Sequence, residues 1–180
     1  GAGSMSTTVH NTYDAYGNLA SYKETATNYE LDADIAYHDL QAKYIVSVPK
    51  HIAVKDKGGK VYRERSTQIN GNGDIISITM HNGTKPSVYD MTYDAYGNLA
   101  SLTKPENHKG QRMRYDYTYD DVLHMLVTNV KDAYGYTSST AYDYKWAVPV
   151  ETSDLNGNKM RYAYDDLGRP STILGPKEIA

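Results

Sequence analysis

The chain has 180 residues and a nearly balanced charge, with 19 Lys and Arg against 22 Asp and Glu and a formal net charge of −3. It contains 19 tyrosines and one tryptophan but no phenylalanine and no cysteine. Without cysteine the chain cannot form disulfides, use thiol catalysis or build iron–sulfur centres. The balanced charge gives no basic surface for nucleic acid, and no apolar run approaches the roughly 18 residues of a membrane-spanning segment. Tyrosine must therefore supply much of the apolar area that folding buries.

The chain begins with a short segment that we set aside. Residues 1–4, Gly-Ala-Gly-Ser, precede Met5, and we interpret residues 1–5 as an expression-vector remnant. Residues 6–180 show no domain boundary in composition, so we treat them as one continuous array and as a fragment of a larger protein.

A repeated turn motif is the dominant feature. Residues 12–21, Thr-Tyr-Asp-Ala-Tyr-Gly-Asn-Leu-Ala-Ser, recur letter for letter as residues 92–101, and residues 163–171 hold a looser copy. Such internal repetition predicts an array of similar structural units. The shared core is Asp-x-x-Gly followed by a polar residue. The predicted structural turn residues are Asp14, Gly17, Asn18, Asp94, Gly97, Asn98, Asp165 and Gly168.

This core predicts a β-hairpin turn. An Asp side chain accepts a hydrogen bond from the backbone two residues on. The Gly three residues after the Asp adopts a left-handed conformation and forms the bulge that restores strand pairing. Because the Asp recurs at every turn, we expect it to cap turns and not to act as a catalytic carboxylate.

Residues 30–44 fit the strand pattern less well, because Leu31, Ile35 and Tyr44 could also form one face of a helix. We expect strands over residues 30–44 with an irregular connection at His38-Asp39. The run Tyr-Ile-Val-Ser-Val at 44–48 then predicts a strand that ends at Pro49.

Further along, side chains alternate with a period of two. Tyr115, Tyr117 and Tyr119 share one parity, while Arg114 and Asp116 share the other. Such alternation between turn signals predicts half-buried strands. The expected fold is all-β, with roughly a dozen strands in tandem antiparallel hairpins that form a curved or spiral sheet, part of a larger shell.

The aromatic rows leave two interpretations open. They form cross-strand ladders inside a thin wall, or they form a platform that binds carbohydrate or a cell-surface ligand. The residues of this binding face are Tyr115, Tyr117, Tyr119, Tyr142, Tyr144, Trp146, Tyr162 and Tyr164.

The sequence predicts no catalysis, no cofactor and no metal site. The six histidines lack the close spacing of zinc ligands, and no glycine motif has the strand–helix context of a nucleotide site. We expect no nucleic-acid partner. Self-association through exposed sheet edges is a further expectation.

The Tyr-Asp-x-x-Gly-Asn/Arg unit resembles the YD repeat of the Rhs family, most clearly at residues 13–19, 93–99 and 164–169. Residues 44–49 and 56–65 are similar to the segment before the repeats in B-component proteins of Tc-type toxin complexes and in wall-associated Rhs proteins. The resemblance implies a bacterial secreted or cell-surface protein whose repeats build a shell around a toxic C-terminal polypeptide. Other repeats of the parent protein and the enclosed toxin are then its partners. The Asp-Pro of self-processing Rhs shells is absent from this sequence.

Overall fold

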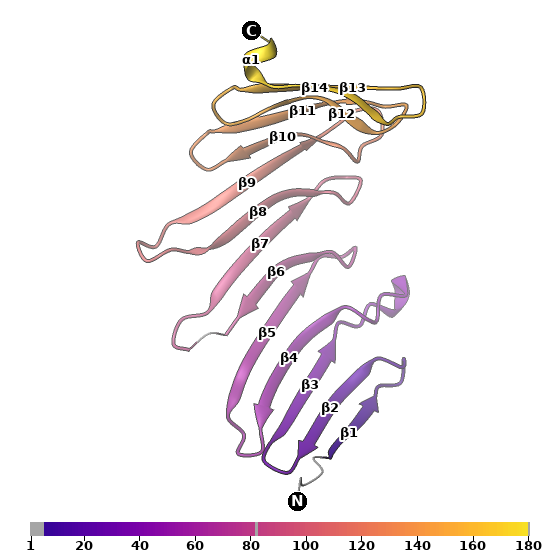
Figure 1. The fold of residues 1–180 in the computed structure, drawn as a ribbon. Coiled ribbons are helices and arrows are strands. Elements are labelled where there is room, and N and C mark those ends of the chain that lie inside the picture. Colours follow the sequence, from indigo (N-terminus) through magenta and orange to yellow (C-terminus); the bar gives the residue numbers. More distant parts are fainter. Residues whose placement is uncertain (1–5, 82, 180) are drawn as a thin grey trace, which may run out of the picture. The chain divides into compact units, whose positions relative to one another are not determined.

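The computed structural model describes residues 6–81 and 83–179, so the predicted vector remnant at residues 1–5 lies outside the described residues. The described chain is almost entirely β (Figure 1). Its strands are β1 (Thr7–Tyr13), β2 (Leu19–Ala26), β3 (Glu30–Tyr37), β4 (Pro49–Asp56), β5 (Val61–Ile69), β6 (Ile75–Met80), β7 (Ser87–Tyr93), β8 (Leu99–Glu106), β9 (Arg112–Tyr119), β10 (Val127–Asp132), β11 (Thr137–Asp143), β12 (Val148–Ser153), β13 (Lys159–Tyr164) and β14 (Pro170–Leu174). A 3-10 helix (Gln41–Lys43) and the short helix α1 (Pro176–Ile179) complete the described elements.

Each strand pairs with its neighbours along the chain. The spatial order of the fourteen strands is the sequence order from β1 to β14, and the pairing is antiparallel, as between β3 and β4 where Ile35 lies opposite Ile52. The predicted all-β array of antiparallel hairpins is therefore confirmed. Its curvature stays a prediction.

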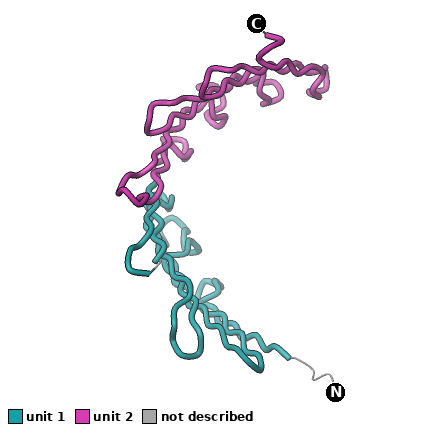
Figure 2. Tube along the Cα trace, turned by 60° about the vertical axis from the view of Figure 1, so that its left-hand side comes forward, with its two compact units in different colours: residues 1–90 teal, residues 91–180 magenta. Residues whose placement is uncertain are grey.

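The chain divides into two compact units, residues 1–90 and 91–180, shown in different colours in Figure 2. The boundary falls inside β7. The duplicated decapeptide occupies the hairpin β1–β2 in the first unit and the connection from β7 to β8 at the start of the second. The proposal that residues 6–180 form one continuous array stays a prediction.

The sheet has no dry core in the described residues. No apolar side chain there is buried, and the two buried residues are polar: Ser101 is 2% and Asp120 is 4% exposed. A sheet buries its apolar face only against a second layer. Within each unit no second layer is described, so the aromatic and aliphatic side chains stay half-buried beside one another.

One predicted strand is wrong. Residues 44–48 do not form a strand, and the next strand, β4, begins only at Pro49. Tyr44 instead ends the 3-10 helix in a left-handed conformation, with φ of 57°, and Ile45 forms an isolated bridge with Leu40. The apolar letters belong to a loop that folds back on itself. The part of the prediction that covers residues 30–37 holds as β3, and the connection that begins at His38 is irregular.

Candidate functional site

The repeated turns share one hydrogen-bond pattern. In the first, Asp14 Oδ1 accepts from the backbone N–H groups of Tyr16 and Asn18 at 2.9 Å, and Gly17 N–H donates to the Asp14 carbonyl oxygen at 3.1 Å. Gly17 has φ of +84°, a conformation that costs glycine nothing. The amide of Asn18 donates to Asp14 Oδ2 at 2.9 Å. This donation is the largest cause that holds the pKa of the Asp14 carboxyl below its ordinary value.

The same backbone pattern occurs at eight five-residue turns of the described chain. These are residues 14–18, 56–60, 70–74, 94–98, 107–111, 132–136, 154–158 and 165–169. Asp94, Gly97, Asn98, Asp165 and Gly168 lie in two of them, at the positions that the sequence analysis assigned. The turn at 107–111 has Asn107 in place of Asp, with Asn107 Oδ1 accepting from Lys109 and Gln111. The Asp-x-x-Gly pattern does not include this turn, for which Asn-x-x-Gly is the signal.

Two of these turns are also hydrogen-bonded to a neighbouring loop. Asn18 Nδ2 donates to the carbonyl oxygen of Val46 at 2.8 Å, and Asn98 Nδ2 donates to that of His124 at 2.6 Å. The ring of His124 stacks on Tyr96, with centroids 3.9 Å apart. The Asn of the motif therefore joins adjacent connections at one end of the sheet in each unit.

Asp120 organises a longer loop that the sequence did not reveal. Its Oδ1 accepts from the N–H groups of Met125 and Leu126 at 3.0 and 2.8 Å, and its Oδ2 accepts from those of residues 122–124. Burial of the carboxyl raises its pKa, but the backbone donors, Leu123 first among them, outweigh burial and hold the pKa far below its ordinary value. No glycine follows at the expected position, so the turn motif does not detect this loop.

The tyrosines that precede a connection have an internal role. The Tyr119 hydroxyl donates to the Leu99 carbonyl oxygen at 3.1 Å, and the Tyr37 hydroxyl donates to that of Leu19 at 3.0 Å. Tyr142 and Tyr164 donate in the same way to Val127 and Pro149. Strand register shifts just before each of these four tyrosines. Each hydroxyl thus ties the end of a strand, where its register with the following strand shifts, to the first residues of the strand before it.

The predicted binding face is brought together only in part. Directly opposed residues share a face, and Tyr115 lies opposite Leu102, Tyr117 opposite Val130, and Tyr162 opposite Ile173. These tyrosines therefore lie on the same aromatic and aliphatic face of the second unit.

Tyr144 and Trp146 lie instead in the connection between β11 and β12, at the end of the sheet. Trp146 covers Gly168, where an added Cβ would come within 2.8 Å of the indole. These two aromatic residues therefore do not belong to the aromatic and aliphatic face of the strands.

The opposite face carries the ion pairs. Lys23 pairs with Glu30 at 2.9 Å, Arg114 with Asp116 at 2.7 Å, and Arg161 with Glu151 at 2.8 Å. Ion pairs near the surface contribute little to stability, so these pairs indicate that this face is solvated. The second unit thus has one ionic face and one aromatic and aliphatic face, and the first unit also carries ion pairs on one face.

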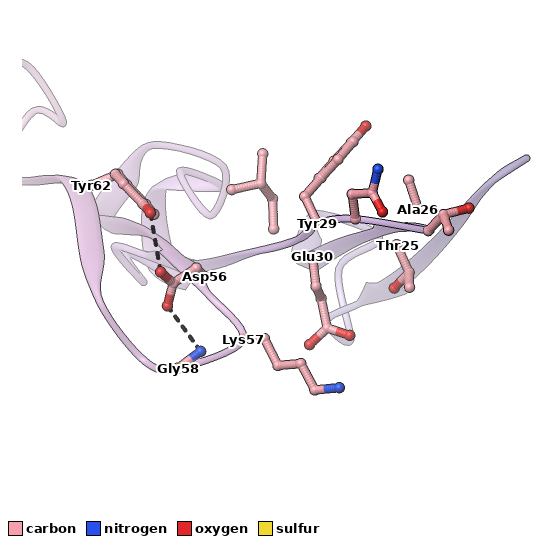
Figure 3. A pocket seen from close by; sticks show the side chains of 11 residues that line it. Thr25, Ala26, Tyr29, Glu30, Asp56, Lys57, Gly58 and Tyr62 are labelled. Atoms are coloured by element: carbon pink, nitrogen blue, oxygen red, sulfur yellow. Dashed lines mark hydrogen bonds between the residues drawn. The ribbon is translucent and has the colours of Figure 1, made fainter. Parts of the chain in front are cut away.

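A pocket lies between two connections at the other end of the first unit (Figure 3). It has a volume of about 610 Å³ and is lined by residues 25–31, residues 56–58 and Tyr62. The two connections meet because Leu31 of β3 lies opposite Asp56 of β4. The repeat pattern does not predict this pocket, because it does not show which connections lie next to one another.

The described residues hold no group of three or more His, Asp or Glu side chains that is arranged to bind a metal ion. In the same residues no helix is long and apolar enough to cross a membrane.

These features define a class of protein, an array of antiparallel β-hairpins with Asx-type turns. No family profile and no curated protein sequence matches the chain. Solved structures do resemble it. The crystal structure of TcdB2-TccC3 covers 89% of this chain at 12% identity with a TM-score of 0.59, and this chain spans 11% of that one. A Photorhabdus luminescens Tc holotoxin pore covers 93% of this chain at 13% identity with a TM-score of 0.50, again over 11% of its own length. The expected resemblance to the repeat shell of Tc toxins is confirmed for the fold.

Proposed function

We propose that residues 6–180 are a non-catalytic wall segment of a larger secreted or cell-surface toxin-like protein of bacteria. In this proposal, further repeats continue the sheet into a shell that encloses a toxic C-terminal polypeptide. The observation that carries the proposal is the single-layered sheet, in which strand order follows chain order and the described residues bury no apolar side chain. A globular domain of this size normally has two packed layers, whereas a wall needs only one.

The difference between the two faces supports the same function. A wall separates an interior from solvent, and its two sides therefore meet different surroundings. The ionic face, with pairs such as Lys159 and Glu151 at 2.6 Å, suits bulk water. The aromatic and aliphatic face suits contact with an enclosed, incompletely folded polypeptide, whose apolar side chains are exposed. The similar Tc structures are themselves much longer than this chain.

Single cysteines on the two faces test the proposal, because the natural sequence contains none. Ser138 lies opposite Val130 on the aromatic and aliphatic face, and Ser139 lies opposite Ser153 on the ionic face. In residues 1–180 alone, Ser138→Cys and Ser139→Cys should both react with a polyethylene-glycol maleimide. In the full-length parent protein, Ser139→Cys should still react and Ser138→Cys should be protected. Equal labelling of both positions in the parent protein would contradict a closed wall.

A further inference from the structure

We propose that the pocket between the β2–β3 and β4–β5 connections binds a neutral carbohydrate. The pocket lies within the first unit, and its 610 Å³ falls inside the roughly 300–1,000 Å³ of small-ligand sites. This binding activity is separate from the wall function and does not depend on it.

Two tyrosine rings stand on different walls of the pocket, as Figure 3 shows. Tyr29 comes from the β2–β3 side and is 48% exposed, and Tyr62 comes from β5 and is 57% exposed. Half-exposed rings offer apolar surface to the C–H groups of a pyranose while their polar ends stay solvated. The pocket therefore has the aromatic surface that a sugar ring needs.

Both rings are held in place before any ligand arrives. The Tyr62 hydroxyl donates to Asp56 Oδ2 at 3.1 Å, and Lys60 Nζ lies 5.1 Å from the centre of the same ring. The Tyr29 hydroxyl donates to a carboxylate oxygen of Glu24. A side chain that is already ordered loses less conformational entropy when a ligand binds. The rings are thus prepared to bind a ligand.

The polar groups in the pocket include both hydrogen-bond donors and hydrogen-bond acceptors. Glu30, which also pairs with Lys23 Nζ at 2.9 Å, supplies carboxylate acceptors, while Lys57 and Asn28 supply donors. The Asp56 carboxylate already accepts from the Tyr62 hydroxyl at Oδ2. Asp56 Oδ1 is already occupied by the N–H groups of Gly58 and Lys60, at 2.9 and 3.0 Å. Sugar hydroxyls both donate and accept, so they suit this mixture. The two carboxylates oppose an anionic ligand, and the number of polar groups opposes a purely apolar one.

Saturation-transfer NMR of the 180-residue chain tests the proposal. The probes are three neutral glycosides, the methyl glycosides of glucose, galactose and N-acetylglucosamine, and one anionic glycoside, methyl glucuronide. We expect transfer to at least one neutral glycoside, with weaker transfer to the glucuronide. No transfer to any neutral probe, or stronger binding of the glucuronide, would overturn the proposal.

Substitutions locate the binding. Tyr29→Ala and Tyr62→Ala should each weaken it about tenfold or more, because each removes a ring. The matched control is Tyr134→Ala, an exposed turn tyrosine of the second unit at 70% exposure, which should leave binding unchanged. Tyr62→Phe keeps the ring and should keep most of the affinity, even if Tyr62→Ala proves to unfold the connection. Two outcomes would show that the sugar binds elsewhere. One is an equal loss of affinity in Tyr134→Ala and Tyr62→Ala, and the other is unchanged affinity in Tyr29→Ala, Tyr62→Ala and Tyr62→Phe.

Discussion

The hydroxyl of Tyr119 donates a hydrogen bond of 3.1 Å to the backbone carbonyl oxygen of Leu99 on the adjacent strand. This bond links Tyr119, at the end of β9, to the first residue after the 94–98 turn, at the same end of the sheet. It gives the tyrosine-rich composition a mechanical role, because phenylalanine has the same ring but no donor.

Removal of that donor should destabilise the second unit. We expect Tyr119→Phe to lower the free energy of unfolding by about 0.5–1.5 kcal/mol, since it leaves a half-buried carbonyl without its partner. The control is Tyr117→Phe on the same strand, for which the described residues show no hydroxyl hydrogen bond, and this variant should change stability little. Urea titration followed by circular dichroism measures both, and equal effects would contradict the assigned role.

The turn glycines should differ in their tolerance of alanine. Gly97→Ala should cost about 1–2 kcal/mol from the left-handed backbone alone, because its φ is +85° and a Cβ would meet nothing within 4 Å. Gly168→Ala should cost more, because the Cβ would also meet the Trp146 indole at 2.8 Å. Thermal melts of both variants measure the difference.

A double substitution separates the two causes at Gly168. In a Trp146→Ala background the indole is gone, and Gly168→Ala should then cost about as much as Gly97→Ala. If Gly168→Ala still destabilised the protein more than Gly97→Ala in that background, contact with the indole would not be the cause of the difference.

The amide–carboxylate pair inside a turn should be exchangeable. Asn158 Nδ2 donates to Asp154 Oδ2 at 2.9 Å, and the turn at 70–74 holds the reverse arrangement, with Asn70 Nδ2 donating to Asp74 Oδ2 at 2.9 Å. Asp154→Asn keeps the Asx turn but replaces the amide–carboxylate hydrogen bond with a weaker one between two neutral amides, like that between Asn107 and Gln111, so the midpoint of unfolding should fall slightly. The double variant Asp154→Asn with Asn158→Asp should recover most of the loss. A double variant less stable than Asp154→Asn would contradict the pairing.

Acid should destabilise the fold. Hydrogen bonds from Asn98 and Asn158 lower the pKa of Asp94 and Asp154, and the backbone donors around Asp120 overcome burial and lower its pKa further. When the folded-state pKa lies below that of the unfolded chain, folding favours the ionised form. The stabilisation is then fully present above the ordinary Asp pKa of about 4 and is lost as pH falls below it. These carboxyl groups should leave the urea concentration at the midpoint of unfolding constant from about pH 7 to pH 5. The midpoint should then fall at lower pH.

The control for the acid prediction is Asp120→Asn. It should be less stable than the natural chain at neutral pH, because one amide oxygen cannot accept all the N–H groups that point at the carboxylate. It should also lose less stability between pH 5 and pH 3. A rise in stability on acidification of the natural chain would contradict the assignment.

The outer edge of β1 should promote self-association. β1 is a terminal strand of the array, all of its residues are exposed, and it carries no Lys, Arg, Asp, Glu or Pro. Edges of this kind pair with other chains. Sedimentation velocity should show concentration-dependent association that Val9→Lys reduces. Ile173→Lys on β14 should reduce it less, and a stronger effect of Ile173→Lys would identify β14 as the pairing edge.

The sequence determined the local structure of this protein. Asp-x-x-Gly specifies its turn within five residues, and period-two alternation specifies the strands and their opposite faces, because both depend on neighbours in the chain. The apolar letters at 44–48 misled the strand prediction, since a left-handed Tyr44 and the bridge from Leu40 to Ile45 depend on how that loop closes.

Only the tertiary structure decided which groups meet across strands. The acceptors of the tyrosine hydroxyls and the pocket between Tyr29 and Tyr62 join residues that strand register brings together. Register is the sum of many pairings and bulges, so no single motif encodes it. The sequence therefore predicted a hairpin array, and the structure showed how its tyrosines and turns hold adjacent hairpins together.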